Sequence, residues 1–218
     1  MPPLRKQLAA EFIGTALLLA TVVGSGVMGE RLAGGNTAIA LLANAIATGG
    51  VLYALIAALG PVSGAHFNPL VTLSAVMLGR LKAKPAGAYV ATQIVAALAG
   101  VLIAHWMFEL PAYFPSQHAR SGQAQLFSEV VAAFGLLLVI LNCARYKPES
   151  IPAAVGLYIT AAYWFTASTS FANPAVTIAR SLTDTFSGIR PLDVPGFIGA
   201  QFVGAVLAVA FFRWITRA

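Results

Sequence analysis

The stretch Ser63-Gly-Ala-His-Phe-Asn-Pro-Leu-Val-Thr72 returns later in the chain as Ser170-Phe-Ala-Asn-Pro-Ala-Val-Thr177. In both copies an Asn-Pro pair follows a long apolar run and precedes a short one. Asparagine is a good N-cap and proline fits the first helical turn, so Asn68 and Asn173 are predicted to cap two short helices. Each copy is therefore expected to form a loop that re-enters apolar surroundings and starts a helix there.

The composition is that of an integral membrane protein. The chain is 59% hydrophobic and 9% charged, whereas soluble domains contain roughly 25% charged residues. A spanning helix needs roughly 20 apolar residues. We therefore predict an all-α membrane protein with six transmembrane helices and two re-entrant half-helices, forming a single transmembrane domain over residues 1–218. The six runs lie near residues 7–29, 36–59, 86–108, 126–144, 151–169 and 195–215.

The net charge of +6 comes from basic residues at the ends of these runs. That placement favours the positive-inside rule over a nucleic-acid partner. It predicts a multi-pass protein of the inner (plasma) membrane with both termini in the cytoplasm. The cytoplasmic set is then Arg5, Lys6, Arg80, Lys82, Lys84, Arg145, Lys147, Arg213 and Arg217, and the outer set is Arg31, Arg120, Arg180 and Arg190.

The chain contains an internal repeat. Residues 7–108 and 126–215 carry the same polar residues in the same order, and each half holds three predicted spans. An odd number of spans per half makes the second half inverted relative to the first. The matched features are Glu11 with Glu129, the two Asn-Pro boxes, and Gln93 with Gln201.

The inverted repeat brings the two boxes into the membrane from opposite sides, so the half-helices should meet near the midplane. Irregular backbone at that depth must be packed in protein or line a water-filled path, which predicts a pore. Two helix N-termini face each other there and their partial positive charges repel cations. The amides of Asn68 and Asn173 can donate hydrogen bonds, so a neutral, hydroxyl-bearing solute suits the pore.

Glu11 and Glu129 are the only acids inside predicted spans. One interpretation is a proton or cation site, as in a proton-coupled secondary transporter. The other, which we favour, is that each carboxylate accepts hydrogen bonds from the backbone amides of the re-entrant loop in its own half. The sequence holds no catalytic set, phosphate-binding box or zinc-ligand spacing, so no enzyme activity, cofactor or metal is expected.

The paired boxes, the repeated Glu and Gln, and the layout of six spans plus two half-helices resemble the major intrinsic proteins, the aquaporins and aquaglyceroporins. The resemblance covers essentially the whole chain and implies a homotetramer with one passive pore per subunit. It groups Glu11, Glu129 and His66, at the mouth of the first loop, as loop-supporting residues. The pore constriction that it implies consists of Asn68, Pro69, Leu70, Asn173, Pro174 and Ala175.

The departures from the family pattern concern selectivity. The first box reads Asn-Pro-Leu in place of Asn-Pro-Ala, which is expected to put a bulkier Leu70 at the central constriction. Val176 stands where the family has an arginine that joins three other residues as the outer selectivity filter. The implied filter is broader and less polar, and suits small polyols, urea, ammonia or metalloid acids. Its residues are Thr48, Tyr163 (with Ala162 as the alternative), Ser170 and Val176.

The pairing of Thr48 with Val176 is similar to that of bacterial channels associated with arsenic resistance. This implies a passive channel for arsenite, as undissociated arsenous acid, and related metalloids, with glycerol and water. A generic glycerol and water channel remains the alternative, and a proton-coupled transporter that uses Glu11 or Glu129 is less favoured.

Overall fold

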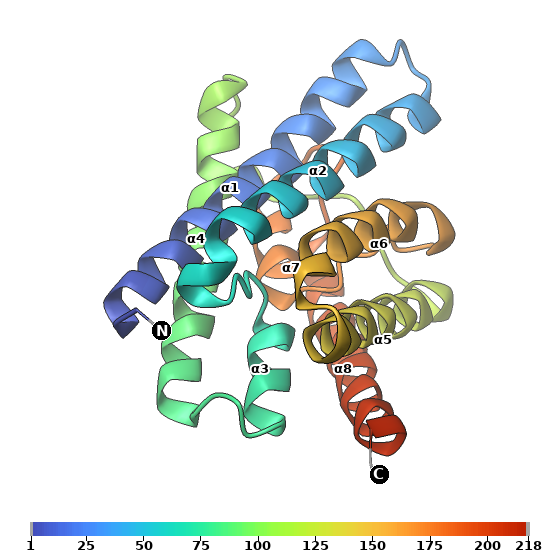
Figure 1. The fold of residues 1–218 in the computed structure, drawn as a ribbon. Helices are drawn as coiled ribbons and strands as arrows, with labels where there is room; N and C mark the ends of the chain where they lie inside the picture. The colour runs from blue at the N-terminus through green and yellow to red at the C-terminus, as the bar shows by residue number, and fades with distance from the viewer. Residues whose placement is uncertain (1, 217–218) are drawn as a thin grey trace.

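The computed structural model describes residues 2–216, so Arg217, counted above among the cytoplasmic charges, lies outside the described residues. Within this range the chain is helical and has no strand (Figure 1). The predicted all-α fold of six long helices and two half-helices is confirmed. The elements are α1 (Leu4–Leu32), α2 (Thr37–Ser63), α3 (Pro69–Met77), α4 (Ala83–Met107), α5 (Gln123–Tyr146), η1 (Pro148–Ser150), α6 (Ile151–Phe165), α7 (Pro174–Arg180), η2 (Pro191–Asp193) and α8 (Val194–Thr216).

The packing of the first four α-helices is matched by that of the last four. Helix α1 packs against α2 and α4, and α5 packs in the same way against α6 and α8. The half-helices cross between the halves, since α3 contacts α8 and α7 contacts α4. Helices α2 and α6 join the halves directly. The two half-helices therefore meet inside a cage of long helices, as Figure 1 shows.

One element differs in length from its predicted span. Five helices are long and apolar enough to cross a membrane, whereas α6 has 15 residues, about 22 Å at 1.5 Å per residue. The run at 151–169 was expected to be helical throughout, but the helix ends at Phe165 because Thr166 adopts an extended conformation. The chain then turns inward and begins the loop that leads to α7.

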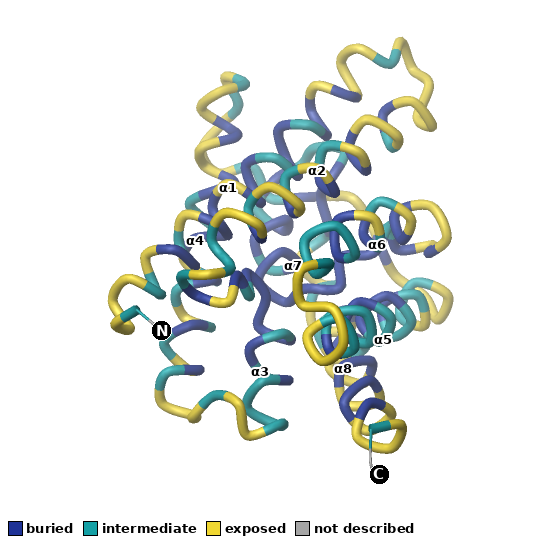
Figure 2. The backbone as a smooth tube through the Cα atoms, viewed as in Figure 1, coloured by how far each residue is buried: buried dark blue, intermediate teal, exposed yellow. Residues whose placement is uncertain are grey.

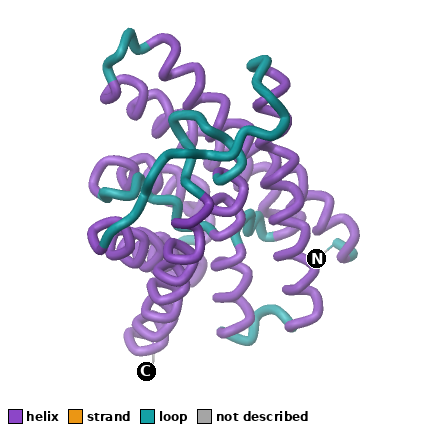
Figure 3. The backbone as a smooth tube through the Cα atoms, turned by 180° about the vertical axis from the view of Figure 1, so that it is seen from behind, coloured by secondary structure: helices purple, strands orange, loops and turns teal. Residues whose placement is uncertain are grey.

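The outer surface of the bundle is apolar. Figure 2 shows buried backbone at the centre of the bundle, where the half-helices lie, and exposed backbone at the periphery and the loops. Large apolar side chains are exposed on this periphery, as suits the surface of an integral membrane protein. Examples are Trp106, Leu157, Phe127 and Val95. The longer loops gather in the upper half of Figure 3, while both marked chain ends lie in its lower half.

Two glycines allow α2 and α6 to touch along their backbones. A Cβ added at Gly49 would lie 1.9 Å from Oγ1 of Thr160, and one added at Gly156 would lie 2.6 Å from the carbonyl oxygen of Gly49. Neither position has room for a side chain. This close crossing brings Thr48 on α2 opposite Tyr163 on α6, across the centre of the bundle.

Candidate functional site: a pore between the half-helices

Both Asn-Pro boxes cap their half-helices as predicted. The Oδ1 atom of Asn68 accepts a hydrogen bond from the Leu70 amide at 2.8 Å. The Oδ1 atom of Asn173 accepts hydrogen bonds from the amides of Ala175 and Val176 at 3.0 and 3.3 Å. Proline occupies the first helical turn in each case, where its missing N–H is not needed. The prediction of two capped half-helices is confirmed.

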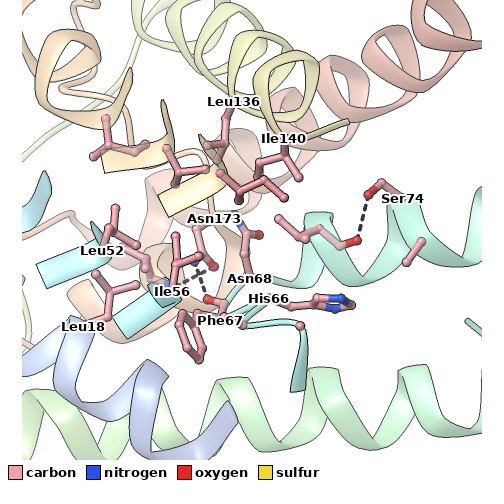
Figure 4. A pocket seen from close by; sticks show the side chains of 18 of the residues that line it. Leu18, Leu52, Ile56, His66, Phe67, Asn68, Ser74, Leu136, Ile140 and Asn173 are labelled. Carbon is pink, nitrogen blue, oxygen red and sulfur yellow. Dashed lines mark hydrogen bonds between the residues drawn. The ribbon is translucent and has the colours of Figure 1, made fainter. Parts of the chain in front are cut away.

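The two boxes are also bonded to each other. The Nδ2 atom of Asn68 donates to the carbonyl of Ala172, and Nδ2 of Asn173 donates to the carbonyl of Phe67, both at 2.8 Å. Figure 4 shows the two asparagines side by side within the cavity. Each amide nitrogen carries two protons, so one proton on each remains for a solute in the cavity that both residues line.

The loops that lead into the half-helices have the same unusual backbone. Ala65 and Phe67 have φ values of +47° and +48°, and Ser170 and Ala172 have φ values of +51° and +46°. In each loop these residues lie three and one positions before the asparagine. Left-handed conformations cost non-glycine residues about 1–2 kcal/mol each. Such loops persist only where the surrounding structure holds them in place.

Glu11 holds the first loop. Its Oε1 atom accepts hydrogen bonds from the Ser63 hydroxyl at 2.7 Å and the His66 amide at 2.9 Å. Its Oε2 atom accepts from the Phe67 amide at 2.7 Å and from Gln93 Nε2 at 2.8 Å. The carboxylate is fully buried and all four groups donate to it, so its bonding is directed at the loop.

Glu129 holds the second loop in the same way. It accepts hydrogen bonds from the amides of Phe171 and Ala172, both at 2.9 Å, and from Gln201 Nε2 at 2.6 Å. It is also fully buried and, like Glu11, does not belong to the cavity lining. These contacts are the loop hydrogen bonds that the sequence interpretation favoured.

His66 extends the support of the first loop toward the cavity. Its Nδ1 atom lies 3.0 Å from the Thr72 hydroxyl on α3, and its ring centroid lies 5.2 Å from that of Tyr89. The Tyr89 hydroxyl donates to the carbonyl of Ser63 at 2.9 Å. His66 thus connects the loop to α3 and α4 while lining the cavity.

A cavity of about 300 Å³ runs past both boxes. At one end it reaches Arg80 and Leu81 next to α4, and at the other Val176 and Arg180 on α7. One wall carries the asparagine amides and the other is apolar, an arrangement that suits a small solute with both polar and apolar surface. The apolar side chains labelled around the asparagines in Figure 4 are Leu18, Leu52, Ile56, Phe67, Leu136 and Ile140.

The four residues predicted as a selectivity filter line this cavity together. Thr48 Oγ1 lies 3.2 Å from the Tyr163 hydroxyl, although the two residues are 115 positions apart. Tyr163 lines the cavity and the alternative, Ala162, does not. The Ser170 hydroxyl has no hydrogen-bond partner among residues 2–216. Val176 completes the group, and their role in selection stays a prediction.

The structure corrects the prediction for the rest of the constriction. Leu70 is fully buried in the hydrophobic core and, unlike Phe67 and Val176 of the same core, is not among the residues that line the cavity. Pro69, Pro174 and Ala175 are also buried and absent from the cavity lining. Of the six predicted constriction residues, only the two asparagines reach the cavity, because each half-helix presents its N-cap and packs its next residues against neighbouring helices.

Sequence reasoning missed two arginines near the Val176 end of the cavity, of which Arg180 lines it. Arg180 and Arg120 were counted as outer charges, yet they are only 2% and 8% exposed. Their guanidinium carbons lie 3.4 and 5.0 Å from the centroid of the same ring, that of Phe171. One signal was available in the sequence: Arg180 follows Val176 by four residues, which places both on one face of a helix.

Arg120 is anchored by the loops around it. Its Nε donates to the carbonyl of Gly188 at 2.7 Å and its NH1 to that of Ser168 at 3.2 Å. Burial lowers the pKa of Arg120 to about 10, so the side chain remains charged at neutral pH. The loops at 108–122, 166–173 and 181–190 are thereby held around a fixed positive charge.

The comparisons with known proteins agree with this geometry. Residues 2–170 match the family described as major intrinsic protein (MIP). The chain is 55% identical to "Aquaglyceroporin AqpS" of Rhizobium meliloti (strain 1021), over 98% of this chain and 91% of that protein. It is 30% identical to "Aquaporin AqpM" of Methanothermobacter marburgensis, over 99% of each.

Its fold is similar to that in the X-ray structure of the aquaglyceroporin from Plasmodium falciparum, with a TM-score of 0.72 and 22% identity over 96% of each chain. At that identity the likeness speaks for the fold alone. The sequence relationships establish more, because they extend over most of the chain. The chain therefore belongs to the major intrinsic protein family and is a membrane channel, not an enzyme.

Proposed function

We propose that the chain is an aquaglyceroporin that passes arsenite, as undissociated arsenous acid, and related neutral metalloids, together with glycerol and water. The observation that carries the proposal is the position of Val176 on the cavity wall beside the Thr48–Tyr163 pair. These residues offer hydroxyl groups and an apolar side chain, and the charged residue that lines this end of the cavity is Arg180, four positions after Val176 on α7. A solute with several hydroxyl groups and no charge finds hydrogen-bonding groups there, with apolar surface beside them.

The channel class is supported by the bonding of the two buried glutamates. A coupled transporter would need Glu11 or Glu129 to exchange protons with the transport path. Both carboxylates accept hydrogen bonds from the backbone amides of their loops and lie outside the cavity lining. We therefore expect solute flux to follow the solute gradient and to be independent of a pH gradient.

Stopped-flow light scattering on proteoliposomes tests the cargo. The wild type should pass arsenous acid, glycerol and water, and Val176→Arg should suppress the two larger solutes while sparing water. Val176→Met is the matched control, because it adds length without charge or hydrogen-bond donors. If only water passes, and Val176→Arg changes nothing, the proposal for the filter and the cargo is wrong and the chain is a water channel.

We further propose that the chain is a single channel domain over residues 1–218 with repeat halves 7–108 and 126–215. It would assemble as a homotetramer in the inner membrane with both termini cytoplasmic. The apolar periphery, and the position of the start of α1 and the end of α8 in the lower half of Figure 1, support this arrangement. Native mass spectrometry should give four chains. In a Cys143→Ser background, an impermeant thiol reagent should label Gly34→Cys in intact cells and leave Lys82→Cys unlabelled.

A further inference from the structure

A second cavity, of about 380 Å³, lies outside the first. Its wall includes Asn44, His118, Arg120 and Thr169 from three parts of the chain. Among the residues that line these two cavities, Arg180 is the one common to both. A solute that moves between the outer cavity and the pore therefore passes the Arg180 side chain.

The guanidinium group of Arg180 is largely free to meet that solute. Its Nε donates to the carbonyl of Ser187, and its face rests on the ring of Phe171. Its two terminal nitrogens donate to no atom of residues 2–216. A guanidinium has five N–H donors, so four remain without a partner in this range, on a side chain that lines both cavities. The guanidinium group is therefore held through its Nε and its flat face, while its terminal N–H groups stay available to a solute.

Arg120 adds a second positive charge at the same place. It stacks on the same ring as Arg180, that of Phe171, and is fixed by two backbone carbonyls. Within residues 2–216 neither arginine forms a salt bridge with a carboxylate, since the ion pair in that range joins Arg190 to Asp193. Two buried charges with no direct ion pair, and with Glu129 as the nearby carboxylate, create a strong local field, because burial weakens screening by water and salt.

We propose that Arg180, with Arg120 behind it, is the specificity-determining charge of the outer entrance. The pair repels cations, and the free donors of Arg180 bind the oxygen atoms of neutral hydroxylated solutes before they reach Val176. Arg180, which selects by charge, and Val176, which lines the pore with an uncharged side chain, are thus separated by one helical turn. The inference requires an open pore, as in the proposed function, but it does not depend on which neutral solute is carried.

Proteoliposomes with a sodium-sensitive dye test the inference when sodium and glycerol permeabilities are measured on the same sample. Arg180→Gln should raise the ratio of sodium to glycerol permeability at least about tenfold. Arg180→Lys keeps the charge and should leave that ratio close to the wild-type value. Arg31→Gln is the matched control: Arg31 also donates to a backbone carbonyl and stacks on a ring, both of Phe108, but lines neither cavity.

A second pair of variants keeps both arginines in place. Thr169 lines the outer cavity with its hydroxyl 3.5 Å from Arg120 NH1 and has a φ of +60°, a conformation that Asp and Asn tolerate. Thr169→Asp introduces a negative charge beside Arg120 and should raise the ratio of sodium to glycerol permeability several-fold, whereas Thr169→Asn should leave that ratio unchanged. Sodium exclusion that survives both Arg180→Gln and Thr169→Asp overturns the inference. Glycerol flux in the same vesicles shows whether the pore is open, and so tests the proposed function separately from sodium exclusion.

Discussion

The replacement of Glu129 by Gln provides a quantitative test of how the second re-entrant loop is held. In the wild type one carboxylate oxygen accepts the Phe171 amide, and the other accepts the Ala172 amide and Gln201. A glutamine side chain has one oxygen and one NH₂ group. If its oxygen keeps the two donors, its NH₂ group faces the Phe171 amide, which is then a buried donor opposite another donor.

An unsatisfied buried donor costs about 1–3 kcal/mol. For a chain of this length each kcal/mol lowers the midpoint of thermal unfolding by about 2–4 °C, so the expected decrease is about 2–12 °C. The measurement is thermal unfolding of the purified protein in detergent, with Glu149→Gln as the control because Glu149 is an exposed carboxylate at the α5–α6 turn.

Flux measurements on the same Glu129→Gln variant separate the two interpretations of the glutamate. A loop support predicts lower stability with solute flux still independent of a pH gradient in the protein that remains folded. The reasoning is refuted if Glu129→Gln unfolds at the wild-type temperature. A wild-type flux that follows the pH gradient, and that loses this dependence in the variant, would instead establish a coupled transporter.

The remaining predictions concern the crossing of α2 with α6. Gly49→Ala should destabilise the protein by about 1–3 kcal/mol, the usual cost of overpacking, because its Cβ would lie 1.9 Å from Thr160 Oγ1; thermal unfolding measures the loss. Gly50→Ala is the control, since its Cβ would have no atom within 4 Å, and it should be neutral or slightly stabilising. Tyr163→Phe removes the hydroxyl that lies 3.2 Å from Thr48, and stopped-flow assays should show a lower ratio of glycerol to water permeability; an unchanged ratio would exclude this hydroxyl from selection.

Much of the fold could be predicted from local features because the membrane restricts the choices. Backbone polar groups in lipid must be satisfied within the chain, so long apolar runs become helices. The Asn-Pro boxes specify helix starts through their own chemistry, and the structure has both caps. The repetition of Glu11 and Glu129 pointed to a shared partner in each half, and each glutamate is bonded to its own loop.

The lining of the pore was less accessible to sequence reasoning. Whether a residue of a half-helix faces the cavity depends on how that helix is rotated against its neighbours. Leu70 was expected in the passage and is fully buried in the core, whereas Arg180 was expected on the outer surface and lines both cavities. The four-residue spacing between Val176 and Arg180 indicates that both lie on one face of a helix, but it does not indicate how deeply Arg180 is buried.

The sequence by itself determined the membrane class, the inverted repeat and the two capped half-helices, because these follow from hydropathy, counting and backbone chemistry within a few residues. Only the tertiary structure decided which side chains share the pore. The contact of Thr48 with Tyr163, and the stacking of Arg120 and Arg180 on Phe171, join residues from different parts of the chain. Such neighbours are set by how closely the helices cross and by loop conformations that distant carboxylates hold in place.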